Sequence, residues 1–390
     1  MKKVRIGVIG TGGMGQGHCQ LIASEQLQEA GLTAVCDIVP EVAQQVGNQY
    51  KVPCFLKHTD LLNSGLVDAV TIATPHYFHP PIAIDAFKRG LHVLSEKPIG
   101  VTVKAANQMI RAAARSKKIF SVMFQHRYSA VNQAAKKLID AGKLGELQRT
   151  NLIVADYRSQ AYYNSAGWRA TWKGEGGGVL LNQAPHSLDI FCWLTGRAKF
   201  IAAQTRTQLH TIEVEDQAFA VLEYPNGAHG YVYASTTDIP QTTRIEICGD
   251  KGKILLDDQG LRFWKITPPV SNFTRENKAM WGAPQAEQVK VELPSGNASH
   301  LEVLRNFCRG ILHNEPLHTP GAEGLYSLEL ANAIILSSYR AKPVRLPLNG
   351  NEYEELLEEL RQKSKIKRGI TDHRETDVQH AKQIAKVTKK

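Results

Sequence analysis

Long apolar runs, metal-type cysteine spacings and internal repeats are all missing from this sequence of 390 residues. No apolar stretch reaches the roughly 20 residues that a membrane-spanning helix needs, and the N-terminal residues enter a strand pattern without an apolar signal segment. The six cysteines, at positions 19, 36, 54, 192, 248 and 308, form no CxxC pair and no Cys/His cluster. These absences argue against a membrane protein, a disulfide scaffold and a metal site, so we expect a cytoplasmic protein.

The formal net charge of +10 is concentrated at the C-terminal end of the chain. Residues 361–390 hold ten Lys and Arg against three Asp and Glu, which gives +7 and leaves +3 for the other residues. The first 360 residues are therefore nearly neutral and lack the overall basic charge typical of nucleic-acid-binding domains. We expect no nucleic-acid partner, no membrane partner and a solvated basic extension at this end.

Strand-like and helix-like patterns alternate through the first third of the chain. The strand-like segments cover residues 4–10, 32–37, 68–74, 92–96 and 119–124, and helical patterns separate them. Such alternation predicts an α/β domain with a parallel, doubly wound sheet. We assign residues 1–125 to this domain.

The pattern changes to closely spaced strands after residue 125. The Asn226-Gly227 pair between two of these strands indicates a hairpin. The segments predict an α+β domain over residues 126–348, with a large, open, mainly antiparallel sheet and helices at 178–194 and near residues 325–340. Residues 349–390 are predicted to form a charged helical and basic extension. Two domains agree with the chain length.

The glycine-rich segment GTGGMG lies between the first predicted strand and helix. Gly10, Gly12 and Gly15 follow the GxGxxG pattern that lets backbone approach a pyrophosphate, and Asp37 ends the next strand where it meets a ribose 2′-hydroxyl. This context predicts a Rossmann dinucleotide-binding domain. Asp37 repels a 2′-phosphate and Ile38 offers no cation, so NAD is favoured over NADP. The expected cofactor contacts here are Gly10, Thr11, Gly12, Gly13, Met14, Asp37 and Ile38.

Two further strand ends carry polar residues, and ligands of doubly wound sheets bind at this edge. The segment TPHYFH places Thr74, His76 and His79 after one strand, and SEKP places Glu96 and Lys97 after the next. We expect these five residues at the cofactor site, with Lys97 beside the nicotinamide. Taken alone, Lys97 also fits a solvated lysine next to a turn proline.

The apolar segment GVLLNQAPHSLD contains Asn182 and His186, four positions apart. Helical spacing would place both side chains on one face. Buried amide and imidazole groups cost free energy unless they have partners, so they form either a satisfied structural pair or a site. Pro185 fits the first turn of a helix, or it kinks the helix and weakens the spacing argument.

These motifs together resemble the glucose-fructose oxidoreductase, inositol dehydrogenase and rhizopine-catabolism (Gfo/Idh/MocA) family, over roughly residues 3–345. The resemblance rests on GTGGMG, Asp37, EKP and a later segment with an acid or amide four residues before a histidine. It implies an NAD-dependent oxidoreductase that oxidises a ring hydroxyl of a sugar, glycoside or cyclitol. Lys97 and His186 are then the proton-handling pair. The resemblance also implies a homodimer or homotetramer that uses the second sheet.

The sequence departs from the family at Asn182, where many members have Asp. An amide cannot accept a proton, so Asn182 is expected to bind a substrate hydroxyl or to orient His186. The base is then His186 or Lys97, and the lysine would need a lowered pKa. A carboxylate introduced at this position would be compensated by these two neighbours.

The polar and aromatic segment 161–178 is the kind of loop that lines sugar sites. Its candidate substrate contacts are Tyr163, Trp168, Arg169 and Trp172, although plain packing explains the aromatics equally well and Arg169 also fits a pyrophosphate contact. Arg127 resembles an arginine that the family keeps near the cofactor or the substrate.

Two other functions remain open on this sequence. A redox-assisted glycosidase would oxidise a sugar hydroxyl transiently and return the hydride after bond cleavage, as some members of the family do. A non-catalytic, cofactor-sensing regulator is the third possibility, but the presence of both Lys97 and His186 argues against it.

Overall fold

The computed structural model describes residues 3–365, and its first sheet has six parallel strands in the order β3-β2-β1-β4-β5-β6. The strands are β1 (Val4–Ile9), β2 (Ala30–Cys36), β3 (Cys54–Phe55), β4 (Ala69–Ile72), β5 (His92–Ser95) and β6 (Phe120–Val122). Their side chains are apolar and mostly buried because helices cover both faces. This order confirms the predicted doubly wound fold.

Amphipathic helices connect these strands. They are α1 (Gly13–Ile22), α2 (Pro40–Tyr50), α3 (His58–Asn63), the 3₁₀ turn η1 (His76–Phe78), α4 (His79–Lys88) and α5 (Val103–Ser116). In α5 the residues Val103, Ala106 and Met109 recur on one face and are buried, and Thr102 caps the helix by accepting a hydrogen bond from the main chain of Ala105.

The second sheet has nine strands in the order β14-β13-β12-β11-β7-β10-β9-β8-β15, and only β7 and β10 pair in parallel. The strands are β7 (Leu147–Ala155), β8 (Phe200–Arg206), β9 (Gln217–Glu223), β10 (His229–Ser235), β11 (Thr242–Gly249), β12 (Gly252–Asp257), β13 (Gly260–Thr267), β14 (Gln285–Val289) and β15 (Val344–Arg345). The predicted hairpin at Asn226-Gly227 joins β9 to β10, with Gly227 at φ +84°.

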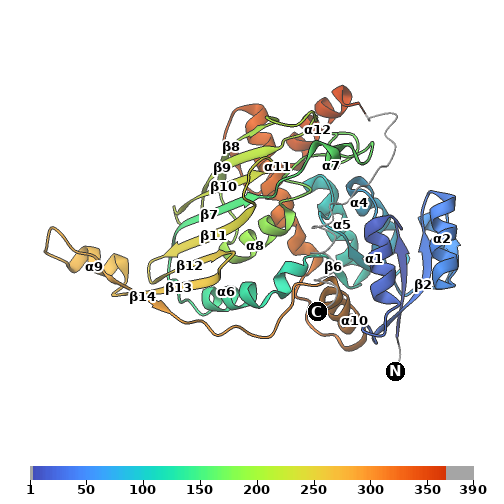
Figure 1. Cartoon of the computed structure of the whole chain (residues 1–390), viewed down its shortest axis with the longest axis horizontal. Coiled ribbons are helices and arrows are strands. Elements are labelled where there is room, and N and C mark those ends of the chain that lie inside the picture. Colours follow the sequence, from blue (N-terminus) through green and yellow to red (C-terminus); the bar gives the residue numbers. More distant parts are fainter. Residues whose placement is uncertain (1–2, 366–390) are drawn as a thin grey trace.

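Helices lie on the face of the second sheet that is turned toward the first domain, as Figure 1 shows. The helices of this half are α6 (Ala130–Asp140), α7 (Gln160–Asn164), α8 (Pro185–Thr195), α9 (Val270–Glu276), α11 (Gly324–Arg340) and α12 (Gly350–Lys363), with the 3₁₀ turns η2 (Gln125–Tyr128) and η3 (Gly321–Glu323). Helices α8 and α11 pack against each other and against the sheet, and α11 also contacts α5. The two sheets are therefore held together through buried helices.

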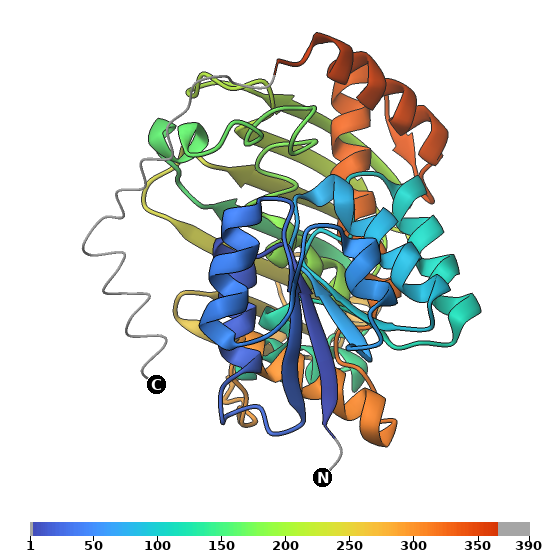
Figure 2. The same cartoon turned by 90° about the vertical axis from the view of Figure 1, so that its right-hand side faces the viewer.

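One helix from the C-terminal half returns to the first sheet. In α10 (His300–His313) the residues Val303, Leu304 and Phe307 pack into a core with Val4 and Ile6 of β1. Figure 2 shows α10, in orange, beside the lower end of the blue strands. A segment from within residues 126–348 thus packs against the first sheet. The domain division proposed from the sequence therefore stays a prediction.

The charged extension expected from residue 349 begins with α12, whose Tyr353, Leu356 and Leu357 are buried in the core beside α11 and α5. The rest of the basic segment, residues 366–390, lies outside the described residues. None of the helices between residues 3 and 365 combines the length and the apolar character needed to cross a membrane.

Candidate active site

The glycine turn between β1 and α1 has the shape that a dinucleotide requires. Gly10 has φ +88°, and a Cβ atom there would lie 2.8 Å from the backbone of Ala73. A Cβ atom on Gly15 would lie 1.8 Å from the carbonyl oxygen of Gly10, so helix and strand approach closely. Gly12 faces open space, and no side chain caps the first turn of α1. The backbone N–H groups in the first turn of α1 are therefore available to a pyrophosphate.

Asp37 follows the last residue of β2 and faces the glycine turn. Its carboxylate accepts hydrogen bonds from the main-chain N–H groups of Thr11 at 2.7 Å and Val39 at 3.0 Å. Both bonds hold a negative charge where the ribose of a dinucleotide bound to this turn would lie. Ile38 beside it is 85 % exposed, and Met14 is half exposed, so both flank the turn from outside.

The ends of β4 and β5 are tied together by His79. Its Nδ1 lies 2.7 Å from the carbonyl oxygen of Pro98, and its Nε2 lies 2.6 Å from that of Thr74. The ring is fully buried. This corrects the prediction that His79 contacts the cofactor, because both ring nitrogens already have protein partners. The hydroxyl of Thr74, in contrast, is buried and has no partner within the described part of the chain.

A buried hydrogen bond between a histidine and a carboxylate joins α1 to the end of β5. Nε2 of His18 donates to the carboxylate of Glu96 at 2.7 Å, and both side chains are almost wholly buried. Burial alone would raise the pKa of Glu96, but the hydrogen bond and charge of His18, with His300 and Lys97 nearby, hold it at about 2. Glu96 is thus a fixed negative charge beneath Lys97.

Lys97 reaches from the end of β5 toward the segment before α8. Its Nζ donates to the main-chain carbonyl of Asn182 at 3.0 Å. Burial lowers the pKa of Lys97, and the negative charges of Glu96 and Glu175 offset part of that effect. An ammonium group with a lowered pKa is suited to exchange protons with a ligand.

Lys97 and His186 line the same cleft, which has a volume of about 580 Å³. The walls come from β5, η2, β7, the segment before α8, α8 itself and the approach to β11. Its polar lining residues are Lys97, His126, Asp156, Arg158, Asn182, Gln183, His186, Ser187, Gln241, Thr242, Thr243 and Asp258. The cleft therefore lies where the carboxyl ends of the parallel strands meet the second sheet.

His186 is in the first turn of α8, which begins at Pro185. Burial lowers the pKa of His186 well below its ordinary value, and positive charge on Lys97, His126 and His300 adds to this effect. The ring stacks on His126 with 4.6 Å between centroids, and its Nε2 accepts a long hydrogen bond of 3.4 Å from the side-chain amide of Gln125. Nδ1 then carries the hydrogen of the neutral ring, and it has no partner among residues 3–365. His186 is therefore a neutral imidazole in which Nε2 is the nitrogen that can accept a proton.

Asn182 does not share a helix with His186, which corrects the spacing argument. Residues 178–182 form turns held by Glu215, whose carboxylate accepts hydrogen bonds from the main chain of Gly178 at 2.9 Å and Leu180 at 3.1 Å. Pro185 lacks an N–H group and starts the helix. Both Asn182 and His186 still line the cleft.

Glu175 is a second buried carboxylate beside the cleft. It accepts hydrogen bonds from the main chain of Ala170 at 2.6 Å and from the side-chain amide of Asn182. Burial raises the pKa of Glu175 to about 7, although Arg169, at 4.0 Å, and Lys97 oppose the rise.

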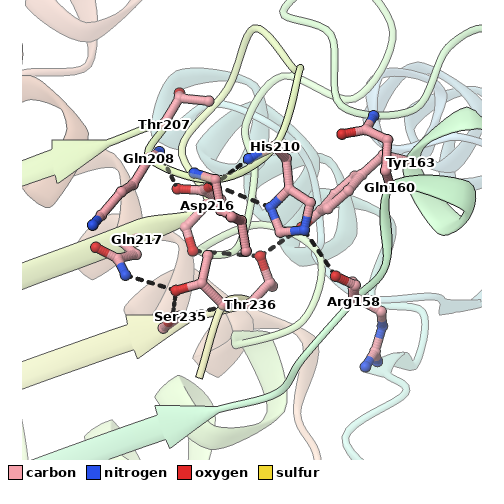
Figure 3. Close-up of polar contacts among 12 residues, drawn as sticks. Arg158, Gln160, Tyr163, Thr207, Gln208, His210, Asp216, Gln217, Ser235 and Thr236 are labelled. Atoms are coloured by element: carbon pink, nitrogen blue, oxygen red, sulfur yellow. Dashed lines mark hydrogen bonds and ion pairs between the residues drawn. The ribbon is translucent and has the colours of Figure 1, made fainter. Parts of the chain in front are cut away.

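Asp156 and Arg158 come from the end of β7 and form a bidentate ion pair with distances of 2.6 and 3.0 Å. His210 fixes this segment, because its Nε2 lies 2.8 Å from the carbonyl oxygen of Arg158 and its Nδ1 lies 3.0 Å from the carboxylate of Asp216 (Figure 3). The same carboxylate accepts three main-chain hydrogen bonds from residues 208–210. This network stabilises one wall of the cleft.

Comparison with protein families decides the relationship. Residues 4–124 match the model described as "Oxidoreductase family, NAD-binding Rossmann fold", and residues 132–255 match the GFO/IDH/MocA C-terminal domain. This chain belongs to the Gfo/Idh/MocA family. The cofactor of the family's N-terminal domain is NAD, which confirms the expected cofactor.

Several known proteins are similar to this family member. The rhizopine catabolism protein MocA of Rhizobium meliloti is 33 % identical over 210 residues, which are 53 % of this chain and 62 % of that protein. An inositol 2-dehydrogenase of Rhizobium meliloti is 23 % identical over 342 residues, 86 % of this chain and 96 % of its own. The WlbA dehydrogenase from Bordetella pertussis, solved with NADH and UDP-GlcNAcA, has a TM-score of 0.76 and 30 % identity, covering 89 % of this chain and all of that one.

In this Gfo/Idh/MocA protein Arg127 does not line the cleft. Its guanidinium group is 2 % exposed and binds Asp189 at 2.6 and 2.8 Å, with a further ion pair to Glu323. This corrects the prediction that Arg127 contacts substrate or cofactor. The arginine instead connects η2 to α8 and η3, because a buried cation needs such partners.

The aromatic loop of residues 161–178 also packs differently from the prediction. Tyr163 is buried and its hydroxyl donates to Thr236 at 2.8 Å, as Figure 3 shows, and Trp172 is buried with its indole N–H on the carbonyl of Glu213. Trp168 is half-buried near His76, and Arg169 lies over the ring of Trp168. Tyr163 is therefore corrected to a core residue, while Trp168 and Arg169 stay predictions.

Sequence reasoning missed several residues in the cleft and one buried behind its wall. Asp156 and Arg158 stand two positions apart at the end of a strand pattern, and that spacing puts them on one face. Glu175 is an acidic residue inside the glycine run GEGGG, just before an apolar segment, which marks it as unusual. Asp258 and His126 carried no such signal, because only the tertiary fold brings them to the cleft.

Proposed function

We propose that this protein oxidises a ring hydroxyl of a cyclic polyol or sugar, with NAD as the hydride acceptor and with Lys97 and His186 handling the proton. The observation that carries the proposal is the shared cleft, in which both residues meet polar side chains at the carboxyl edge of the NAD-binding sheet. The names of inositol dehydrogenase and WlbA dehydrogenase among its relatives support the same reaction class.

The proton leaves the substrate hydroxyl as its C–H bond loses a hydride. NAD, when bound at the glycine turn, supplies the acceptor for that hydride. His186 is neutral, and its Nε2 receives only a long hydrogen bond from Gln125, so this nitrogen fits the role of base. Lys97 then donates a hydrogen bond to the developing alkoxide and becomes the alternative base when its pKa is low enough.

The charges of the cleft favour an uncharged substrate. Arg158 is neutralised by Asp156, Asp258 adds a negative charge, and Lys97 is the remaining cation of the lining residues. Binding a carboxylate or a pyrophosphate needs an unpaired arginine or lysine in addition to the proton-handling group. The paired Asp156 and Arg158 are instead suited to accept from and donate to hydroxyl groups.

The protein is further proposed to be a cytoplasmic homo-oligomer. All six cysteines are free thiols, as is typical of a reducing compartment. The face of the second sheet opposite α8 and α11 exposes Phe219, Val221 and Tyr231 on β9 and β10. An exposed patch of this kind is typical of a subunit interface. Light scattering on Phe219→Asp beside the parent protein tests this contact.

The test of the function is a panel of cyclitols, neutral sugars, a uronic acid and aryl glycosides, each incubated with the protein and NAD. We expect net NADH from neutral ring polyols and little from the uronic acid. Release of aglycone without net NADH would instead support the redox-assisted glycosidase. If NADH binds but no compound of the panel yields NADH or free aglycone, an enzymatic role for the cleft is contradicted.

A further inference from the structure

Glu175 is a buried carboxylate that the proposed reaction does not use. It is 1 % exposed and lies in the wall behind Asn182. Removing a carboxylate from water is costly unless hydrogen bonds compensate it. Glu175 has two such bonds, one from the main chain of Ala170 and one from the side chain of Asn182.

These two bonds fix which way the amide of Asn182 points. An ionised carboxylate only accepts hydrogen bonds, so the group that faces Glu175 has to be the Nδ2 of the amide. The Oδ1 atom is then on the other side of a residue that lines the cleft. Across residues 3–365 no hydrogen bond engages this Oδ1. Asn182 therefore presents an acceptor to the cleft.

We propose that Glu175 is a positioning residue that makes Asn182 a hydrogen-bond acceptor for a hydroxyl group of the substrate. The inference rests on the proposed function, because a polyol supplies hydroxyl donors next to the carbon that is oxidised. Without Glu175 an amide could turn either end toward the cleft. With Glu175 ionised, only substrates that donate at this point are favoured, which makes the pair a determinant of specificity.

Ionisable groups around Glu175 make this orientation depend on pH. Arg169 and Lys97 favour its ionised form, Glu215 opposes it, and Nδ1 of His76 lies 3.2 Å from its main-chain carbonyl. The pKa of Glu175 is raised to about 7 by burial. Above that pH the carboxylate accepts from Nδ2. Below it, the protonated acid donates to Oδ1 instead, so the acceptor in the cleft is lost as the pH falls through about 7.

The variant Glu175→Gln tests the proposal because the introduced glutamine has only one acceptor oxygen, and a main-chain N–H group already binds at that position. The N–H of Ala170 occupies that oxygen, which leaves the new side-chain amide to donate toward residue 182. Asn182 must then turn its Oδ1 to the introduced glutamine and its Nδ2 to the cleft. We expect KM to rise roughly 10- to 100-fold with a smaller change in kcat, the pattern of a lost binding contact.

Rescue distinguishes positioning from plain stability. In the double variant Glu175→Gln with Asn182→Asp, one oxygen of the new carboxylate accepts from the introduced glutamine and the other faces the cleft as an acceptor. We expect the double variant to recover most of the KM lost in Glu175→Gln. The control is Glu213→Gln, another carboxylate of this wall that binds Trp172 and Ser364 and does not touch Asn182. An unchanged KM in Glu175→Gln, or a double variant no better than the single one, would overturn the proposal.

A readout without turnover separates this proposal from the proposed function. In protein labelled with ¹⁵N-asparagine, the side-chain NH₂ signal that disappears in Asn182→Asp belongs to residue 182. We expect this signal to titrate near pH 7 in the parent protein and not in Glu175→Gln. A signal that does not move with pH in the parent protein would contradict the contact. This holds whether or not any compound of the panel is oxidised.

Discussion

The cofactor side and the substrate side of Lys97 hold their charges in opposite ways. On the cofactor side, His18 bonds Glu96 and keeps its pKa at about 2. On the substrate side, burial raises the pKa of Glu175 to about 7 and lowers that of His186. Charge is therefore fixed on one side and changes near neutral pH on the other. The proton chemistry is expected on the side where protonation states can change.

Replacing Lys97 is expected to give the largest effect, because this residue lies between the two sides. Lys97→Ala, and the longer apolar Lys97→Met, should lower turnover by a factor on the order of 10² to 10⁴ while NADH binding is retained. Steady-state kinetics and NADH fluorescence titration measure the two quantities. Lys88→Ala, at an exposed site, is the control. Turnover within a factor of about three of the parent enzyme would assign Lys97 to structure alone.

Removing His18 is expected to destabilise the fixed charge of Glu96 on the cofactor side. His18→Phe fills the space but leaves the Glu96 carboxylate buried without its side-chain donor, which costs about 3–5 kcal/mol of unfolding free energy. The lowered pKa of Glu96 stabilises the parent protein above about pH 4.5, and this contribution is lost as the pH falls toward 2. Urea unfolding should therefore show a larger difference at pH 7 than at pH 4.

The matched control for that pair is Glu96→Gln in the His18→Phe background. A neutral amide needs no counter-charge, so the double variant should recover part of the lost stability. If His18→Phe alone unfolds at the same urea concentration as the parent, the fixed charge on the cofactor side contributes nothing measurable.

The two sides also differ in how far the sequence predicts them. On the cofactor side, the glycines and Asp37 lie within one βαβ unit, so local rules place them correctly relative to each other. On the substrate side, the cleft combines residues from 97 to 258, and only tertiary packing brings them together. Local spacing therefore predicts that Lys97 and His186 matter without predicting what surrounds them.

The corrected residues show why this is so. Arg127 binds Asp189, which lies sixty-two positions later in the sequence, and no local pattern reveals that pairing. Asn182 and His186 have helical spacing, but Glu215 binds the main chain of residues 178–180 and keeps that segment in turns. Long-range partners of buried polar groups therefore decide both cases, and a single sequence does not display them.

Changing Asp37 should affect the cofactor side alone. NAD is expected to bind more tightly than NADP, because the Asp37 carboxylate lies beside the turn and repels a 2′-phosphate. Asp37→Asn keeps the shape and removes the charge, so the preference should narrow roughly 10- to 100-fold, mainly through tighter NADPH binding. Fluorescence titrations with NADH and NADPH measure it. A parent protein that prefers NADPH would refute the role of Asp37.

The variant Asn182→Asp is expected to have the smallest effect. It tests most directly whether protonation states change on the substrate side of Lys97. The sequence alone suggests that Lys97 and His186 compensate the new carboxylate, but the structure places Glu175 against this side chain. Two carboxylates in contact share a proton, so the pair acquires a raised pKa.

The sign of the resulting pH dependence follows from proton binding. In the parent protein Glu175 alone already holds its proton up to about pH 7, so the two proteins respond alike below that pH. Above it the folded variant still holds the shared proton that its unfolded chain has released, so its stability falls relative to the parent as the pH rises from about 7. We expect melting temperatures that nearly coincide at pH 5 and separate by a few degrees at pH 9. If the variant matches the parent in stability at both pH values, Lys97 or His186, and not a shared proton, neutralises the carboxylate introduced at position 182. Charge on the substrate side would then be fixed, as it is on the cofactor side.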